Sequence, residues 1–293
     1  MIEPVRLQGP SLLYLATVLG RVLWPLALLA LVVAALGLRL LAAPSGDSIR
    51  AAVAPAPGGS AYQASGNELL LLDASGARHR LGPLPTSSPL ALAAGSKLVL
   101  GAADGVFTSD NGAVWSRASV PGRHFLSVAA SGDRLAAASW AGGLWLSDDA
   151  GVSWRRSPLP PGDLEVSSIS LGQPDLLATL LGLLESSDQG RTWTRVPGLP
   201  GRMTAVDRNG PDLVAGAWRG QTYRSRGAGW EPVDYRRAGI WAVAAGAGAE
   251  ATTDGLFQRG VHRLAGREVT ALVVSGSTLF AFEAGGKVTI LEA

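Results

Sequence analysis

The stretch Ser147-Asp148-Asp149-Ala150-Gly151-Val152-Ser153-Trp154 decides the fold, because the chain repeats its pattern. Copies of the form S/T-x-D-x-G-x-x-W occur three times, and their tryptophans stand 39 residues apart, at 115, 154 and 193. A degenerate fourth copy ends at Trp230. The specified residues are Thr108, Asp110, Gly112, Trp115, Ser147, Asp149, Gly151, Trp154, Ser186, Asp188, Gly190 and Trp193. Four residue types at constant spacing indicate a repeat architecture.

Each copy has the chemistry of a tight turn between two strands. The Asp carboxylate and the Ser or Thr hydroxyl can accept hydrogen bonds from backbone N–H groups of the turn, and Gly permits a positive φ. The Trp then packs as a large apolar surface between neighbouring sheets. Because periodic repetition is what a scaffold element requires, we interpret Asp110, Asp149 and Asp188 as structural residues rather than as catalytic acids or metal ligands.

Short strands surround each copy in a fixed order. A strand of small residues comes first, as in 90–95, 127–132 and 167–172, and three more strands follow, with the motif between the last two. This order predicts four antiparallel strands per repeat, the blade of a β-propeller. Ala, Ser and Gly suit the first strand because innermost strands converge on the axis of the ring. We therefore expect an all-β fold.

Seven such units cover residues 48–293, so we predict a seven-bladed β-propeller of four-stranded antiparallel blades, preceded by one N-terminal transmembrane helix. The units are 48–83, 86–121, 123–161, 163–200, 202–237, 238–266 and 268–293. The last unit has room for only three strands, and we expect the segment just after the anchor to supply its outer strand and close the ring. Six or eight blades stay open as alternatives, because the terminal repeats are the least regular.

The N-terminal part differs in composition from the repeats. Val22–Leu38 carries no charge, lies between Arg21 and Arg39, and reaches about 25 Å as a helix, which is enough to cross a bilayer. We divide this part into a tail (1–10), a transmembrane anchor (11–41) and a linker (42–47). A cleaved signal peptide is the alternative, since the small residues Ala42 and Ala43 follow the apolar run. Arginines on both sides leave the orientation undecided by charge, and an anchor followed by one large domain favours an extracytoplasmic propeller.

Composition excludes several classes of function. The chain has no Cys, so it has neither disulfides nor thiolate metal sites. Its net charge is only +2, which is too small for a nucleic-acid partner unless the basic residues gather on one face. His79, His124 and His262 lack the spacing of metal ligands, and no phosphate-binding loop occurs. We expect no cofactor, no metal and no nucleic acid.

The three S/T-x-D-x-G-x-x-W copies resemble the Asp boxes of the bacterial neuraminidase repeat superfamily, over residues 48–293. That superfamily includes sialidases, sortilin-type receptors and photosystem II assembly and stability factors, and the repeat length is most similar to the assembly-factor branch. The resemblance implies a propeller that binds membrane-protein partners. The sialidase branch fits less well, because the chain lacks an Arg-Ile-Pro tripeptide and a recognisable pair of carboxylates.

Propeller geometry nominates a surface for a partner. Asp-box turns gather at one face, while the loops from the second to the third strand, and from one blade to the next, emerge at the other. The polar and aromatic residues of these loops are Asp104, Arg123, His124, Trp140, Arg202, Trp218, Arg219, Arg236 and Arg237. Exposed Trp and Arg are typical of binding hot spots, although the two tryptophans equally suit packing between blades.

These observations predict a non-enzymatic, membrane-anchored scaffold. We expect it to lie in the bilayer through its N-terminal helix and to bind a membrane protein complex, as an assembly factor or an accessory subunit. The alternative is an extracytoplasmic sialidase-like glycoside hydrolase or a glycan-binding module.

Overall fold

The computed structural model describes residues 51–140, 143–227 and 229–293. The chain divides into two compact units, Met1–Gly46 and Asp47–Ala293, and all described residues belong to the second. The predicted tail, anchor and linker therefore lie outside the described residues. No helix within the described ranges is long and apolar enough to cross a bilayer.

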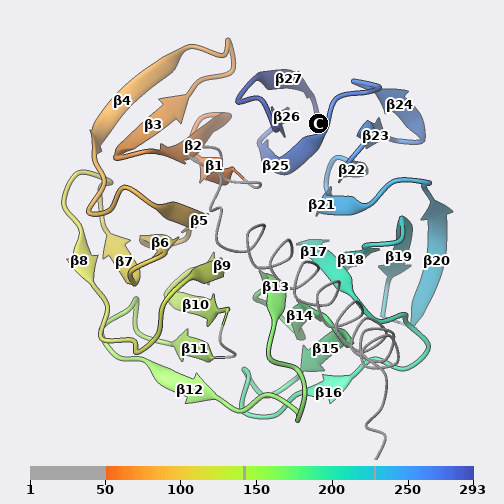
Figure 1. The fold of residues 1–293 in the computed structure, drawn as a ribbon, viewed down its shortest axis with the longest axis horizontal. Coiled ribbons are helices and arrows are strands. Elements are labelled where there is room, and N and C mark those ends of the chain that lie inside the picture. Colours follow the sequence, from red (N-terminus) through yellow and green to blue (C-terminus); the bar gives the residue numbers. More distant parts are fainter. Residues whose placement is uncertain (1–50, 141–142, 228) are drawn as a thin grey trace, which may run out of the picture. The chain divides into compact units, whose positions relative to one another are not determined.

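Seven antiparallel sheets follow one another around a ring (Figure 1). Blades 1 and 2 are β1 (Ala52–Ala56), β2 (Ser60–Ser65), β3 (Glu68–Leu72), β4 (Arg78–Pro83), β5 (Pro89–Ala94), β6 (Leu98–Ala102), β7 (Val106–Ser109) and β8 (Ser116–Arg117). Blades 3 and 4 are β9 (Phe125–Ser131), β10 (Arg134–Ser139), β11 (Leu144–Ser147), β12 (Arg155–Ser157), β13 (Val166–Ser170), β14 (Asp175–Thr179), β15 (Gly182–Ser186) and β16 (Thr194–Arg195). Blades 5 to 7 are β17 (Met203–Asn209), β18 (Asp212–Ala217), β19 (Gln221–Ser225), β20 (Trp230–Tyr235), β21 (Ile240–Ala244), β22 (Ala249–Thr252), β23 (Gly255–Gln258), β24 (Val261–Arg263), β25 (Val269–Ser275), β26 (Thr278–Glu283) and β27 (Val288–Glu292).

This arrangement confirms the predicted seven-bladed propeller of sequential antiparallel blades. The core lies between blades, because each sheet packs its faces on the next. Strands β6 and β14 are buried along their whole length, since they have a neighbouring sheet on both sides. The innermost strands surround a central cavity of about 650 Å³ and line it mainly with Ala, Ser, Val and Leu side chains.

The seventh blade closes the ring through side chains. Within the described residues its sheet has the order β25-β26-β27, and β1 belongs to the first blade, so no described strand supplies the predicted fourth strand. Instead, Ser275 Oγ donates to the carbonyl of Ala56 at 2.6 Å, and Arg78 Nη2 donates to the carbonyl of Gly286 at 3.0 Å. Phe280 and Phe282 of β26 pack between the two blades in one apolar cluster with Leu72.

The second and third motif copies form the expected hydrogen-bonded turns. Ser147 Oγ donates to Asp149 Oδ1 at 2.8 Å and accepts from the N–H of Gly151 at 2.8 Å. Ser153 donates to Asp149 from its hydroxyl at 2.6 Å and from its N–H at 2.9 Å. The Ser153 hydroxyl is the main cause that holds the pKa of Asp149 at about 2. In the next blade the Thr192 hydroxyl likewise lowers the pKa of Asp188.

The first copy uses different residues from those predicted. The N–H of Gly112 donates to Ser109 Oγ at 2.8 Å, and Asn111 Oδ1 accepts from the N–H of Ala113 at 2.9 Å. Asp110 lies outside these bonds, and its carboxylate faces Lys97 at 3.3 Å. Thr108 is buried on β7 instead of capping the turn. The reason is that this turn reaches its glycine one residue sooner after the strand, so its hydroxyl and acceptor come from Ser109 and Asn111.

The motif glycines bring each turn into contact with the preceding blade. Gly112, Gly151 and Gly190 have φ values of 75°, 84° and 75°. A Cβ atom at these positions would lie 2.5 Å from a methyl group of Leu69, 3.0 Å from one of Thr108 and 2.3 Å from one of Leu146. These three side chains stand on β3, β7 and β11, the third strands of the preceding blades. Glycine is therefore required both by the backbone conformation and by the close approach of two blades.

The motif tryptophans stand at matching places, each just before the fourth strand of its blade. Trp115 and Trp154 donate from Nε1 to the carbonyls of Gly112 and Gly151, both at 3.1 Å. Trp193 instead donates to Ser157 Oγ of the preceding blade at 2.8 Å, and Ser157 donates to the carbonyl of Gly190 at 2.6 Å. The indole of the fourth blade thus ties two blades through a serine hydroxyl.

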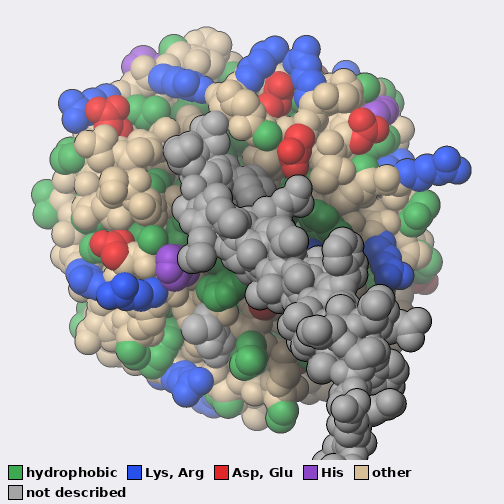
Figure 2. Space-filling model, viewed as in Figure 1, with side chains coloured by type: hydrophobic (Ala, Val, Ile, Leu, Met, Phe, Trp, Pro, Cys, Tyr) green, Lys and Arg blue, Asp and Glu red, His purple; other side chains and the backbone are tan. Residues whose placement is uncertain are grey.

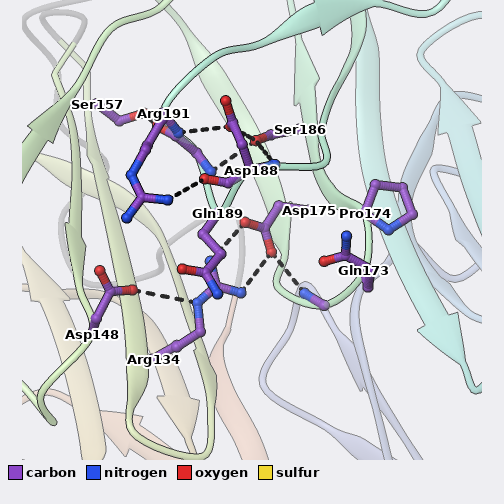
Figure 3. Close-up of polar contacts among 12 residues, drawn as sticks. Arg134, Asp148, Ser157, Gln173, Pro174, Asp175, Ser186, Asp188, Gln189 and Arg191 are labelled. Carbon is purple, nitrogen blue, oxygen red and sulfur yellow. Dashed lines mark hydrogen bonds and ion pairs between the residues drawn. The ribbon is translucent and has the colours of Figure 1, made fainter.

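A buried ion pair joins blades 3 and 4 on the same face (Figure 3). Arg134 donates to both carboxylate oxygens of Asp175, at 2.9 and 2.7 Å, and Asp175 is fully buried. The N–H of Gly172 donates to the same carboxylate at 2.8 Å, and Asp148 lies 3.5 Å from Arg134 Nε. The paired charge and the additional donor compensate for the desolvation of Asp175.

We expect Gly190→Ala to destabilise the propeller by about 2 kcal/mol or more, because the new methyl group would overlap Leu146. Gly198→Ala is the matched control, since Gly198 also has a positive φ of 78°, but a Cβ atom added there would meet no other atom within 4 Å. The control should cost only about 1 kcal/mol of backbone strain. Urea unfolding of both variants measures the difference, and equal losses would refute the close contact between blades.

The Asp149 turn should make stability depend on acidity. The folded pKa of about 2 lies below the ordinary value of 3.8, so the contribution is complete above pH 3.8 and is lost as the pH falls through about 2. We expect Asp149→Ala to lower the free energy of unfolding at neutral pH, and its difference from the wild type to shrink in acid. Asp110→Ala should change stability little at either pH, and a comparable loss there would contradict the assignment of the first turn to Ser109 and Asn111.

Candidate interaction face

The face opposite the motif turns is built by one repeated backbone contact. In six blades, the residue after the second strand donates its N–H to the carbonyl of the residue before the first strand of that blade. The pairs are Ala103 to Ser88, Trp140 to His124, Leu180 to Glu165, Trp218 to Arg202, Thr253 to Gly239 and Ala284 to Glu268. We call the six donor residues the tip positions. Because the backbone repeats, the side chains at these positions project from equivalent places.

Two further backbone contacts join neighbouring blades. The N–H of His124 donates to the carbonyl of Ala103 at 3.0 Å, and the N–H of Arg202 donates to the carbonyl of Leu180 at 2.6 Å. Both residues have left-handed backbones, with φ values of 54° and 57°, although neither is glycine. Such a conformation is costly for a residue with a side chain and persists where surrounding contacts impose it. The left-handed peptide lets one residue connect two successive tips.

Large apolar side chains occupy the tip positions of blades 3 to 5 only. Trp140 is 54% exposed, and Leu180 is also exposed. Leu181 and Leu164 stand beside Leu180 and are 45% and 60% exposed. We call Trp140, Leu164, Leu180 and Leu181 the apolar tips. On the face that Figure 2 displays, hydrophobic side chains reach the surface among β9–β15, and Arg or Lys side chains gather towards the rim.

Polar contacts fix the loop of blade 4 that carries Leu180 and Leu181. Arg195 donates to the carbonyl of Leu181 and also pairs with the carboxylate of Asp163, which is fully buried. The hydroxyl of Thr179 donates to the same carboxylate at 2.7 Å. These polar contacts fix the backbone of the loop while Leu181 keeps its side chain in solvent. The exposure of these leucines is thus a consequence of the local structure.

An arginine–tryptophan cluster covers the tips of blades 5 and 6. Arg202 Cζ lies 4.6 Å from the ring centroid of Trp218, which meets the edge of Trp241 with centroids 5.0 Å apart. Trp241 Nε1 donates to Glu268 Oε1 at 2.8 Å. Stacking of a guanidinium on an indole combines a cation–π attraction with a planar set of donors. We name Arg202, Trp218, Trp241 and Glu268 the arginine–tryptophan cluster.

Arg236 is engaged within the protein by ion pairs and differs in this from Arg123, Arg219 and Arg237. Its side chain is 14% exposed, pairs with Asp234, and donates from Nε to Glu250 at 2.8 Å. Its guanidinium also lies 4.1 Å from the ring centroid of Phe257, and His262 stacks on this ring. These contacts leave Arg236 little capacity for a partner.

The remaining predicted residues lie on the loops as expected from their places between strands. Arg123, Arg219 and Arg237 are exposed and make no ion pair with any described residue. Asp104 is exposed, and its backbone carbonyl accepts from Arg117 Nη2 at 2.6 Å. Sequence reasoning missed Leu164, Leu180, Leu181, Trp241 and Glu268. Alignment of the repeats would have found Leu180, because it corresponds to Trp140 and Trp218.

The central cavity is lined by few charged side chains. Among the described residues, the charged ones that line it are Asp207 and Arg208 on β17. Burial raises the pKa of Asp207, whose Oδ2 accepts from the N–H of Ala245 at 2.8 Å. Arg208 donates to Ser170 Oγ at 3.0 Å and to the carbonyl of Pro174. One carboxylate does not make the facing pair that glycoside hydrolysis uses, and the described residues hold no cluster of metal-binding side chains.

Comparisons with known proteins support the fold. No protein-family model matches the sequence, and no curated protein matches it. Among solved structures, streptogramin B lyase is similar with a TM-score of 0.67 and 12% identity, over 85% of this chain and 95% of the lyase. YCF48 from Cyanidioschyzon merolae has a TM-score of 0.59 and 14% identity, over 85% of this chain and 96% of that one. The computationally designed protein Ika8 has a TM-score of 0.62 and 15% identity, with 85% of each chain covered. At these identities the similarity shows the β-propeller fold alone.

We expect Arg195→Ala to destabilise the propeller by about 3 kcal/mol, because it leaves the carboxylate of Asp163 buried without its cation. Arg226→Ala is the control, since Arg226 and its partner Asp212 are both solvent-accessible, and it should cost about 1 kcal/mol or less. Equilibrium unfolding in urea checks both values. If both variants lose the same free energy of unfolding, the ion pair of Arg195 with Asp163 does not stabilise the loop that carries Leu181.

Proposed function

We propose that this protein is a membrane-anchored, non-catalytic Asp-box propeller that binds protein partners through its loop face. It would act as an assembly factor or accessory subunit of a membrane protein complex, with the propeller on the extracytoplasmic side. The observation that carries this proposal is the arginine–tryptophan cluster together with the exposed Arg219 and Arg237 beside it. The propeller is shared with YCF48, and that likeness supports the fold on which the proposal rests.

The chemistry of these residues favours a partner with acidic groups. Arg219 and Arg237 have no ion-pair partner among the described residues, so their guanidinium groups are free to pair with carboxylates. Trp218 and Trp241 add apolar area with few rotatable bonds, and binding such side chains costs little conformational entropy. Tryptophan and arginine are the residue types that most often dominate binding energy at protein interfaces.

A sialidase-like hydrolase or glycan-binding module is the second candidate. The central cavity of about 650 Å³ favours it, because a cavity of this volume accommodates a small ligand. Among the described residues that line the cavity, Asp207 supplies one carboxylate and no second acidic group faces it, which opposes this candidate because hydrolysis needs two. Turnover of a fluorogenic sialoside by the purified protein would support this candidate.

Affinity purification from native membranes tests the first proposal. The full chain should recover stoichiometric membrane proteins, and Arg219→Glu combined with Arg237→Glu should weaken binding roughly tenfold or more. The control combines Arg156→Glu with Arg191→Glu, which makes the same charge change away from the loop face, on β12 and in a motif turn. If both double variants recover the partner equally well, the arginines of the loop face do not form the binding site.

A further inference from the structure

Four of the ten large exposed hydrophobic side chains of the described residues stand on loops of two adjacent blades, on one face. Trp140, Leu164, Leu180 and Leu181 all stand on loops of blades 3 and 4, whereas the other large exposed hydrophobic residues are dispersed. Those on motif turns or outer strands are Leu81, Val114, Val152, Val233, Tyr235 and Val261. Single exposed hydrophobic residues are ordinary, but a tryptophan and three leucines on neighbouring loops of one face require an explanation.

Charges of both signs lie around the apolar tips, and the exposed acid is Asp104 on the neighbouring loop of blade 2. Arg123 and Arg202 are exposed on the connections that enter blades 3 and 5. The acidic residues of the connection that enters blade 4 are Asp163, which is buried and paired with Arg195, and Glu165, which is half-buried. A surface that combines Trp, Leu and Arg matches the interfacial layer of a bilayer with anionic lipids.

The chain also enters the propeller on this face. Ala51 precedes the innermost strand of blade 1, as His124 and Arg202 precede those of blades 3 and 5 on the loop face. The apolar stretch Val22–Leu38 ends only 13 residues before Ala51 (38 to 51), a span of at most about 45 Å when extended. The segment that follows a membrane anchor at Val22–Leu38 would therefore join the propeller on its loop face.

We propose that the apolar tips insert into the interfacial layer of the membrane that anchors the chain, so that the loop face of blades 3 and 4 lies on the bilayer. This inference rests on the anchor of the proposed function. Trp140 would lie among the headgroups, the three leucines would reach the acyl boundary, and Arg123 would contact lipid phosphates. A bilayer needs no complementary shape, so side chains on separate loops are buried at once. The cluster of blades 5 and 6 is then left to meet proteins at the membrane surface.

The absence of cysteine makes this docking directly measurable. A single cysteine replaces Leu181 or Leu164 in the full chain and is labelled with a nitroxide. Each labelled protein is then reconstituted into vesicles of phosphatidylcholine and phosphatidylglycerol. Val152→Cys and Val114→Cys are the controls, because these residues are 83% and 72% exposed on the motif turns. We expect collisions with dissolved oxygen to exceed those with a water-soluble nickel chelate severalfold at 181 and 164, and the reverse at 152 and 114.

The outcomes separate docking from anchoring. If the protein floats with the vesicles while the labels at 181 and 164 are as accessible to the nickel chelate as those at 152 and 114, docking is wrong and the anchor stands. If the protein does not float with the vesicles, anchor and docking fail together. If the labels at 181 and 164 become inaccessible to the nickel chelate only after native membrane proteins are added, a protein partner rather than lipid covers the apolar tips. That result would overturn the inference. The labels at 181 and 164 should give the same result, which excludes a local effect of either substitution as its cause.

Discussion

The whole propeller depends on the close approach of each motif turn to the blade before it. The glycines at 112, 151 and 190 leave room for a side chain of the preceding third strand, at a distance that would overlap a Cβ atom at 112 and 190 and crowd one at 151. The carboxylate or amide of the turn satisfies the backbone N–H groups that this tight geometry leaves without strand partners. Seven blades can close into a ring only if successive sheets keep the same separation, and the turn sets that separation in the blades that carry it.

Ring closure shows what happens where the motif is absent. Blade 7 has neither the S/T-x-D-x-G-x-x-W motif nor a described fourth strand, yet it meets blade 1 through Phe280, Phe282 and the Ser275 hydroxyl. Aromatic area and one short hydrogen bond there perform the role that glycine and tryptophan perform elsewhere. The same interface between blades is therefore stabilised by two different sets of residues, and only the first set leaves a repeating signature in the sequence.

Much of the fold was predictable, since constant spacing and strand order define blades without any knowledge of contacts. The residues of the first turn were not, because Thr108 and Ser109 both offer a hydroxyl, and only the shorter path to Gly112 selects Ser109. For the candidate site, the loops of the nominated residues followed from strand order. Whether each residue is free did not follow: Trp140 is exposed, Trp218 is covered by Arg202, and Arg236 is engaged by two carboxylates.

The two faces of the propeller therefore carry different constraints. On the motif face, side chains complete the hydrogen bonds of turns and link blades, so a change there acts on the stability of the ring. On the loop face, the backbone of the tips is held by a repeated N–H to carbonyl contact that is independent of side-chain identity. The tip positions can therefore hold Ala, Thr, Leu or Trp without altering the scaffold. Because the fold does not require a large apolar residue at these positions, Trp140 and Leu180 are better explained by what they contact outside the propeller than by its stability.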